Sequence, residues 1–158
     1  MSKSADSESG TILVRDAFVG ERAVLELLQR RSSDVWEEYR EQLAAYPDAI
    51  ELPEAFVADG WVRVAVGADD VPVGFAVVIP REDGVHELDG LFVEPARMRR
   101  GIGRVLVEDA CGRARAAGAA LLEMVAGPAE GFYAMVGFDV VGAAQTRFGP
   151  AVRMRRLL

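Results

Sequence analysis

The turn at residues 93–104, which reads VEPARMRRGIGR, most constrains what this chain can fold into. The run 85–93 that leads into it carries apolar residues between turn signals and predicts a strand. From Ile102 onward, apolar residues recur at helical spacing and predict a helix. The first N–H groups of a helix lack internal partners and lie at the positive end of its dipole. The turn therefore predicts an anion site, most often a phosphate site.

Two glycines and three of the four arginines in this turn strengthen that prediction. Gly101 and Gly103 carry no side chain, so a bound group can approach the backbone closely. The guanidinium groups of Arg99, Arg100 and Arg104 are well suited to phosphate. We expect at least one of these arginines to contact a phosphate. The alternative is that some of them are only solvated surface residues.

The composition is that of a globular protein. The chain has 158 residues, of which 51% are hydrophobic and 27% charged, as is typical of a folded domain. We expect a flexible polar tail at 1–10 and a single domain at 11–158. The tail lacks an apolar signal segment, and no apolar run approaches the length of a membrane span. We therefore expect a cytoplasmic protein with no membrane partner.

The net charge and the counts of cysteine and histidine argue against two classes of function. The formal charge is −7, whereas nucleic-acid-binding domains are usually basic, so we expect no nucleic-acid partner. One cysteine, Cys111, excludes an internal disulfide, and with the single histidine, His86, it cannot supply four zinc ligands. We predict no metal. Cys111 falls on the apolar side of its segment and predicts a buried, inert thiol.

The periodicity along the chain predicts a mixed α+β domain. The expected strands are 11–15, 61–66, 73–79, 85–93, 121–126, 138–143 and 151–157, and the expected helices are 21–31, 35–45, 102–117 and 128–136. Short turns between the three middle strands predict an antiparallel meander. The strand–helix–strand order around the turn predicts two parallel strands. In the first helix, Val24, Leu27 and Leu28 mark the expected apolar face.

Local signals predict where three elements begin or turn. Asp34 is expected to cap the second helix, with Glu37 as its partner in a capping box. Pro128 is expected near the first position of the last helix, where proline is well tolerated. A short turn of helix is expected at 54–57 inside an otherwise irregular loop. The turn between the last two strands is expected at Gly149-Pro150.

A second motif, GFYAMVGF at 131–138, follows downstream of the turn. The two motifs, in this order and at this distance, resemble the GNAT superfamily of N-acetyltransferases. The signature of that family is Arg/Gln-x-x-Gly-x-Gly/Ala followed by a Phe-Tyr-x-x-x-Gly-Phe stretch. The resemblance covers about 11–158 and is strongest from residue 60 onward. Two positions depart from it: Met98 stands where the family has Arg or Gln, and Gly127 stands where many members have Asn.

The resemblance implies the GNAT fold, an α+β architecture with a mixed, mostly antiparallel central sheet flanked by helices. It also implies acetyl-CoA as co-substrate and direct transfer of the acetyl group to a primary amine of a small molecule or protein. The pantetheine arm would bond the backbone of the strand before the turn, and the pyrophosphate would lie on the turn. The implied cofactor-binding residues are Leu91, Phe92, Val93, Met98, Arg99, Arg100, Gly101, Ile102, Gly103 and Arg104.

Three residues are candidates for the proton transfers. An attacking amine must be neutral, so a carboxylate takes its proton, directly or through water. Glu87 and Asp89 lie two apart on one strand and so on one face. Glu87, fourteen residues before Gly101, matches by spacing the general-base glutamate of the histone-acetylating branch, and Asp89 is the alternative. Tyr133 matches the family tyrosine that protonates the leaving thiolate. Each could instead be an ordinary solvated or packed residue.

The acceptor and the oligomeric state stay open. In this fold the acceptor site is built by residues that correspond here to Trp36, Glu37, Tyr39, Arg40, Tyr46, Asp48, Glu51 and 145–148. They do not identify the amine. The alternative function is a GNAT-fold module that binds acyl-CoA without turnover. A dinucleotide-binding Rossmann domain fits poorly, because an antiparallel meander precedes the glycines. Homodimers are common in this fold, and no sequence pattern decides whether this chain forms one.

Overall fold

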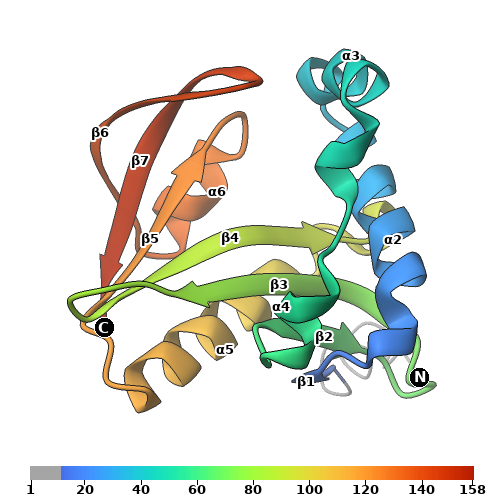
Figure 1. Ribbon diagram of the computed structural model, residues 1–158, viewed down its shortest axis with the longest axis horizontal. Helices are drawn as coiled ribbons and strands as arrows, with labels where there is room; N and C mark the ends of the chain where they lie inside the picture. Colours follow the sequence, from blue (N-terminus) through green and yellow to red (C-terminus); the bar gives the residue numbers. More distant parts are fainter. Residues whose placement is uncertain (1–11) are drawn as a thin grey trace. The chain divides into compact units, whose positions relative to one another are not determined.

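The computed structural model describes residues 12–158 (Figure 1). The predicted polar tail at 1–10 lies outside these residues. The chain divides into two compact units, which are described separately. Among the described residues, the first unit comprises 12–77 and 90–106, and the second comprises 78–89 and 107–158.

The described chain forms seven strands in the order β1-β2-β3-β4-β5-β7-β6. The strands are β1 (Leu13–Asp16), β2 (Val62–Val66), β3 (Pro72–Pro80), β4 (Val85–Val93), β5 (Leu121–Ala126), β6 (Asp139–Thr146) and β7 (Gly149–Leu157). The α-helices are α2 (Arg22–Asp34), α3 (Glu37–Ala45), α4 (Glu54–Ala58), α5 (Ile102–Ala116) and α6 (Glu130–Met135), with 3-10 turns η1 (Val19–Glu21), η2 (Pro47–Ile50) and η3 (Pro95–Arg97). The predicted α+β class with a mostly antiparallel sheet is confirmed.

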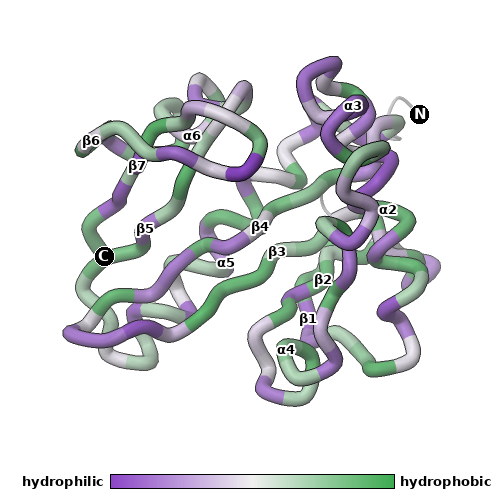
Figure 2. The backbone as a smooth tube through the Cα atoms, turned by 45° about the horizontal axis from the view of Figure 1, so that its top comes forward, coloured by the Kyte–Doolittle hydropathy of each residue, from purple (hydrophilic) through white to green (hydrophobic). Residues whose placement is uncertain are grey.

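The first unit is built on the antiparallel strands β1, β2 and β3. Strand β3 is buried along most of its length, and Figure 2 shows it as a largely hydrophobic tube. Phe75 on β3 and Val64 on β2 are fully buried, so both belong to the core of this unit. At Gly74 an added Cβ would lie 2.9 Å from the carbonyl oxygen of Phe92. Only glycine therefore lets β3 approach the backbone of β4 at this point.

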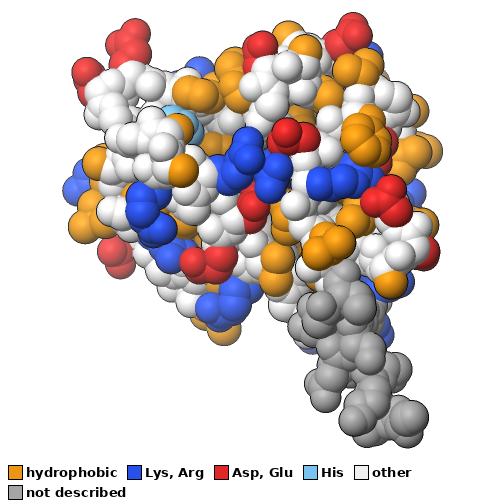
Figure 3. Space-filling view, turned by 90° about the horizontal axis from the view of Figure 1, so that it is seen from below, with side chains coloured by type: hydrophobic (Ala, Val, Ile, Leu, Met, Phe, Trp, Pro, Cys, Tyr) orange, Lys and Arg blue, Asp and Glu red, His pale blue; other side chains and the backbone are white. Residues whose placement is uncertain are grey.

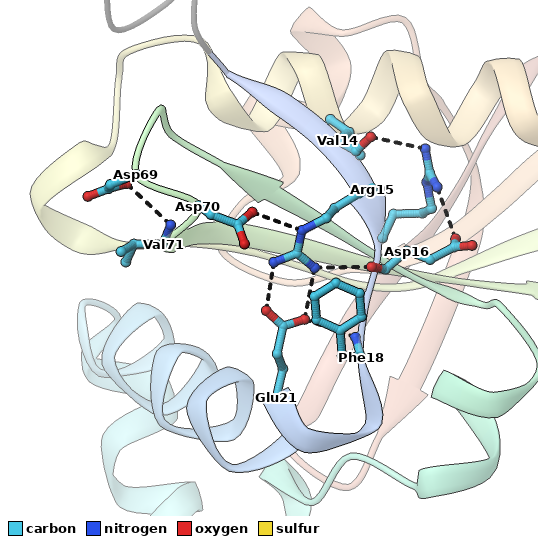
Figure 4. A network of polar contacts seen from close by, with 9 residues as sticks. Val14, Arg15, Asp16, Phe18, Glu21, Asp69, Asp70 and Val71 are labelled. Atoms are coloured by element: carbon cyan, nitrogen blue, oxygen red, sulfur yellow. Dashed lines mark hydrogen bonds and ion pairs between the residues drawn. The ribbon is translucent and has the colours of Figure 1, made fainter.

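Arg15 anchors β1 to the start of helix α2 in the first unit (Figure 4). Its two terminal nitrogens donate to the carboxylate of Glu21 at 2.9 and 2.8 Å, and its Nε donates to Asp70 at 3.2 Å. The guanidinium also lies 4.3 Å from the ring centroid of Phe18. The hydrogen bond from Arg15 is the main cause that lowers the pKa of Glu21 below its ordinary value. A planar, forked pair of this kind fixes orientation as well as charge.

The second unit joins the start of β4 to β5, β7 and β6, which lie side by side in Figure 1. Strands β4 and β5 are parallel, as predicted, and the pairs β5–β7 and β6–β7 are antiparallel. Arg156 on β7 links this unit internally. Its Nη1 donates to Glu108 of α5 at 2.8 Å and to the carbonyl oxygen of Val136, after α6, at 2.9 Å.

Two predictions about the N-terminal helices are wrong. Asp34 does not cap the second helix, because α2 continues through it and α3 begins at Glu37, after Trp36. Ser32 and Ser33 are buried, and the helix continues through them to Asp34.

The buried face of α2 is also rotated from the predicted one. Leu25 and Leu28 are fully buried, whereas Val24 and Leu27 are 47% and 56% exposed. Of the three residues expected on the apolar face, only Leu28 is therefore in the core. Residues 24 and 28 share a face by spacing alone, so periodicity could not choose between positions 24 and 25.

Two predicted boundaries in the second unit are also wrong. Helix α6 begins at Glu130 rather than near Pro128, because the Glu130 N–H first closes a turn on the carbonyl oxygen of Gly127 at 3.2 Å. The last hairpin turns at 147–148, so Gly149 and Pro150 already belong to β7. The short helix expected at 54–57 is confirmed as α4.

Candidate active site

The arginine–glycine turn enters helix α5 through two residues in the left-handed region. Arg99 has φ 65° and Gly101 has φ 86°. A Cβ on Gly101 would meet nothing within 4 Å, so the backbone conformation, and not crowding, favours glycine here. A left-handed non-glycine residue such as Arg99 costs of order 1 kcal/mol or more and is often found at ligand sites.

The N-terminus of α5 has the unpaired donors that the sequence predicts. The first bond of the helix runs from the Val105 N–H to the Gly101 carbonyl oxygen at 3.0 Å. The N–H groups of Gly101, Ile102, Gly103 and Arg104 donate to no backbone carbonyl within residues 12–158. The Met98 N–H, by contrast, donates to the Pro95 carbonyl oxygen at 3.3 Å. The free run of donors thus lies at 101–104 and excludes Met98.

Helix α2 holds the segment that leads into this turn. The guanidinium of Arg31 forms a forked pair with Glu94, at 2.9 Å from Nε and 2.8 Å from Nη2. The Ser32 hydroxyl accepts the Val93 N–H at 3.4 Å. Phe92 packs its ring 5.1 Å from that of Phe75. Of the predicted pantetheine contacts, the Val93 N–H therefore already has an acceptor within its own unit.

In the second unit, the register of β4 and β5 brings two carboxylates together. The pairing covers Val85–Glu87 and Leu121–Glu123, with Glu87 opposite Glu123. Residues directly opposite in neighbouring strands point to the same face. Arg81, just after β3, donates from both Nε, at 2.7 Å, and Nη2 to one oxygen of Glu87, Oε1. Within the described residues, Oε2 of Glu87 has no hydrogen-bond partner.

These charged residues line a cavity of about 320 Å³ that lies wholly within the second unit. Its lining residues are Arg81, Glu82, Val85, Glu87, Glu123, Met124, Val125 and Arg153. Val125 pairs with Arg153 across β5 and β7, which brings the arginine to the same face as Glu123. The cavity therefore combines three carboxylates with two guanidinium groups. Its volume is in the range of small-molecule sites in proteins.

Asp89, the alternative base, lies two residues beyond Glu87 on β4 and is not among the residues that line the cavity. It is exposed as a whole residue, yet protein atoms around its carboxyl replace part of the water there. This desolvation raises the pKa of Asp89 above its ordinary value. The charge of Glu87 raises the pKa further, and Arg81 lowers it. A base whose pKa approaches the working pH accepts protons more usefully.

Tyr133 on α6 is buried, with 7% of its surface exposed. Its ring lies edge-on to those of Phe132 and Phe138, at centroid distances of 5.1 and 5.8 Å. These two aromatic contacts restrict the position of the ring. A buried tyrosine usually keeps its hydroxyl hydrogen-bonded, which agrees with either a packing or a proton-donating role.

Sequence reasoning missed four charged residues of the cavity, which are Arg81, Glu82, Glu123 and Arg153. One signal was available: Glu123 is the one charged residue in the otherwise apolar strand β5. The residues expected at the acceptor site in α3, the following loop and 145–148 do not line this cavity. Cys111 is 1% exposed, as predicted, and burial raises the pKa of its thiol.

Among residues 12–158, no helix is both long and apolar enough to cross a lipid bilayer. Within the same residues, no group of three or more His, Cys, Asp or Glu is arranged to hold a metal ion. On the face drawn in Figure 3, basic and acidic side chains are interspersed with apolar ones. That face therefore offers no uniformly basic surface of the kind that binds a phosphate backbone.

Comparisons with known proteins agree on one family. A model described as the acetyltransferase (GNAT) family matches residues 22–138. Peptidyl-lysine N-acetyltransferase YjaB of Escherichia coli (strain K12) is 36% identical over 108 residues, which are 68% of this chain and 65% of that protein. The protein of the same name from Salmonella typhimurium (strain LT2) is 34% identical over 116 residues, 73% of this chain and 75% of that one. The chain thus matches slightly less than two thirds of the length of the E. coli relative.

Two solved structures share the fold. The PaiA N-acetyltransferase from Thermoplasma acidophilum, in complex with coenzyme A, superposes with a TM-score of 0.76 at 19% identity and covers 94% of this chain and 99% of its own. The solution structure of apo-form YjaB from E. coli superposes with a TM-score of 0.71 at 27% identity, over 91% of this chain and 96% of its own.

Proposed function

This chain belongs to the GNAT family of acetyltransferases, and we propose that it transfers the acetyl group of acetyl-CoA to the side-chain amine of a lysine in a protein. The observation that carries the proposal is the cavity in which Glu87 presents an oxygen without a partner. The similarity to two peptidyl-lysine N-acetyltransferases supports lysine as the acceptor.

The first unit fits coenzyme A, because the unpaired N–H groups at 101–104 are suited to bind an anion. These groups would bind the pyrophosphate, with added charge from Arg99, Arg100 and Arg104. The backbone of Leu91, Phe92 and Val93 would hold the pantetheine arm. The polar position of the family signature is Met98 here, so we expect binding to rest on backbone donors and arginines. When bound, acetyl-CoA supplies the acetyl group as a thioester.

Glu87 takes the proton that the lysine ammonium must lose before its nitrogen can attack. An alkyl ammonium has a pKa near 10, so a nearby carboxylate or a water held by one has to accept this proton. The unpartnered Oε2 of Glu87 is the atom suited to this step. Asp89 is the alternative base, supported by its raised pKa.

Tyr133 donates a proton to the sulfur as the carbon–sulfur bond breaks, and the nitrogen that has bonded to the acetyl carbon releases its second proton to water. Its support is the match to the family motif at 132–138 and the fixed position of its ring between two phenylalanines. Proton exchange with water then restores Tyr133 and Glu87. For the whole protein we also propose a cytoplasmic location. We propose no nucleic-acid partner, which its charge of −7 supports. We also propose that the protein forms a homodimer, and we assign no residue to its interface.

The test is acceptor-dependent release of coenzyme A. The purified full chain is incubated with acetyl-CoA and a lysine-containing peptide, and the free thiol is measured together with the mass of the peptide. We expect thiol release and one added acetyl group per peptide. Glu87→Gln should reduce turnover at least about a hundredfold, the lower end of the range of effects for losing a general base. Tight binding of acetyl-CoA without peptide-dependent release would favour the non-catalytic module instead.

A further inference from the structure

The cavity of the second unit contains more charge than an amine alone requires. A site for a lysine ammonium needs carboxylates, and Glu87 and Glu123 supply them. It does not need guanidinium groups, yet Arg81 and Arg153 line the same cavity. Neither Glu123 nor Arg153 forms a side-chain hydrogen bond or ion pair with another residue in 12–158. Charges of both signs therefore face the cavity without a partner.

Two cavity residues without a partner among the described residues, Glu123 and Arg153, occupy successive positions on one face of the sheet. Glu87 and Glu123 stand opposite each other across β4 and β5, where like charges destabilise each other. Arg81 offsets part of this repulsion through its ion pair with Glu87, and an ammonium group between the two carboxylates would relieve the rest. Arg153 stands opposite Val125, one step of the same face further along β5. A group that carries a cation at one end and an anion at the other matches this order of charges.

From this arrangement we propose that the acceptor carries a carboxylate beside its amine, and that Arg153 and Arg81 bind this carboxylate while Glu87 and Glu123 bind the amine. The inference rests on the proposed acetyltransferase function. For a protein acceptor, the carboxylate is the side chain of an aspartate or glutamate next to the lysine. For a free amino acid it is the α-carboxylate, and the same cavity chemistry recognises both.

Charge balance during the reaction supports a role for Arg81. When Glu87 accepts the amine proton it becomes neutral, and Arg81 loses the counter-ion that it now holds through Nε and Nη2. A carboxylate on the acceptor replaces that counter-ion. Guanidinium groups are well suited to such an exchange, because their donors form a fork that matches a carboxylate. No atom is transferred in this exchange beyond the amine proton already assigned to Glu87.

The experiment compares kcat/KM for matched peptides that differ only in the residue beside the lysine, glutamate in one and glutamine in the other. Free lysine is a third acceptor. We expect the wild-type full chain to prefer the glutamate peptide about tenfold. The Arg153→Gln variant should lower this ratio towards one, and Arg153→Lys should restore part of it. A higher rate on free lysine than on the glutamate peptide would identify the α-carboxylate as the source.

Arg115→Gln is the matched control. It removes one positive charge from an exposed position of α5 that does not line the cavity, so it should leave the preference unchanged. Equal kcat/KM for the two peptides in the wild type, with no preference for free lysine, would overturn the inference while leaving the acetyltransferase function intact. Absence of thiol release with every acceptor would overturn the function itself. Thermal denaturation checks that Arg153→Gln is folded. If the folded variant keeps the wild-type preference for the glutamate peptide, Arg153 does not belong to the site.

Discussion

At the scale of single residues, the two left-handed positions of the turn show which of its features the sequence motif predicts and which it does not. The sequence predicted that Gly101 lets a ligand approach closely, and the structure adds that the backbone conformation at this position, with φ 86°, favours glycine. It also places Arg99 in the same region, at φ 65°, which no sequence pattern indicated. A left-handed arginine is unusual, because its Cβ crowds its own backbone.

Replacing Gly101 by alanine should therefore weaken both folding and cofactor binding. The Cβ would meet no atom within 4 Å, so the cost comes from the backbone alone, about 1 kcal/mol of folding free energy. We expect weaker binding of acetyl-CoA by calorimetry. The matched control is Gly112→Ala in α5, where a Cβ also has open space but φ is not positive. That change should raise stability by up to about 1 kcal/mol, and equal effects of the two variants would contradict the argument.

Asp89 gives a prediction about pH. Its folded pKa is raised by burial of the carboxyl and by Glu87, so its charged form is disfavoured in the folded state. The stability that depends on Asp89 is present below its unfolded pKa of about 3.9 and is lost as pH rises through the raised folded pKa. Asp89→Asn should therefore stabilise the protein at pH 7, by less than about 1 kcal/mol because the residue is exposed.

Chemical denaturation at several pH values checks this prediction for Asp89. The gain from Asp89→Asn should disappear as pH falls below about 3.9. A variant that is less stable than the wild type at pH 7, or a gain that grows in acid, would contradict the raised pKa.

At the scale of elements, strands were predicted better than helix ends. The bounds of β4 and β5 were predicted correctly because turn residues flank both runs. The start of α3 was predicted incorrectly. Asp34 and Glu37 have the spacing of a capping box, but Asp34 can cap α3 only if it lies outside the preceding helix. In the structure Asp34 is instead the last residue of α2. The cavity could not be predicted either. The pairing of Glu87 with Glu123 depends on the register between β4 and β5, which the sequence of neither strand alone determines.

Arg156 carries the element-scale prediction. It joins β7 to Glu108 on α5 and to the carbonyl oxygen of Val136 after α6, so one side chain connects three segments of the second unit. Arg156→Met keeps an unbranched apolar stem but removes these bonds. We expect a loss of about 1.5–3 kcal/mol, the range for hydrogen bonds to charged groups. Urea denaturation measures it, and a loss below about 0.5 kcal/mol would show that water replaces the guanidinium without cost.

At the scale of the whole molecule, three elements are common to the two compact units. Strand β3, strand β4 and helix α5 each begin in one unit and end in the other. A strand or helix that loses half of its partners loses the support for its remaining backbone bonds as well. The family and its fold could be predicted from the motifs at 93–104 and 131–138, but this division could not, because both motifs are local.

We therefore expect one cooperative unfolding transition. Both tryptophans, Trp36 and Trp61, belong to the first unit, so their fluorescence reports that unit alone. Far-ultraviolet circular dichroism reports the helices and strands of both. The two signals should change at the same urea concentration, which is the test for two-state behaviour. Two separated midpoints would show instead that the shared elements fray at the boundary at residues 77–78.

The ion pair between Arg81 and Glu87 also spans the turn between β3 and β4, where the Arg81 N–H donates to the Val85 carbonyl oxygen at 2.8 Å. The same side chain that would recognise an acceptor therefore helps to close a hairpin. If an acceptor carboxylate draws Arg81 away from Glu87, the turn at 81–84 loses a cross-link. Amide hydrogen exchange at this turn would then quicken as the cavity fills, so that the backbone of the hairpin reports on the contents of the cavity.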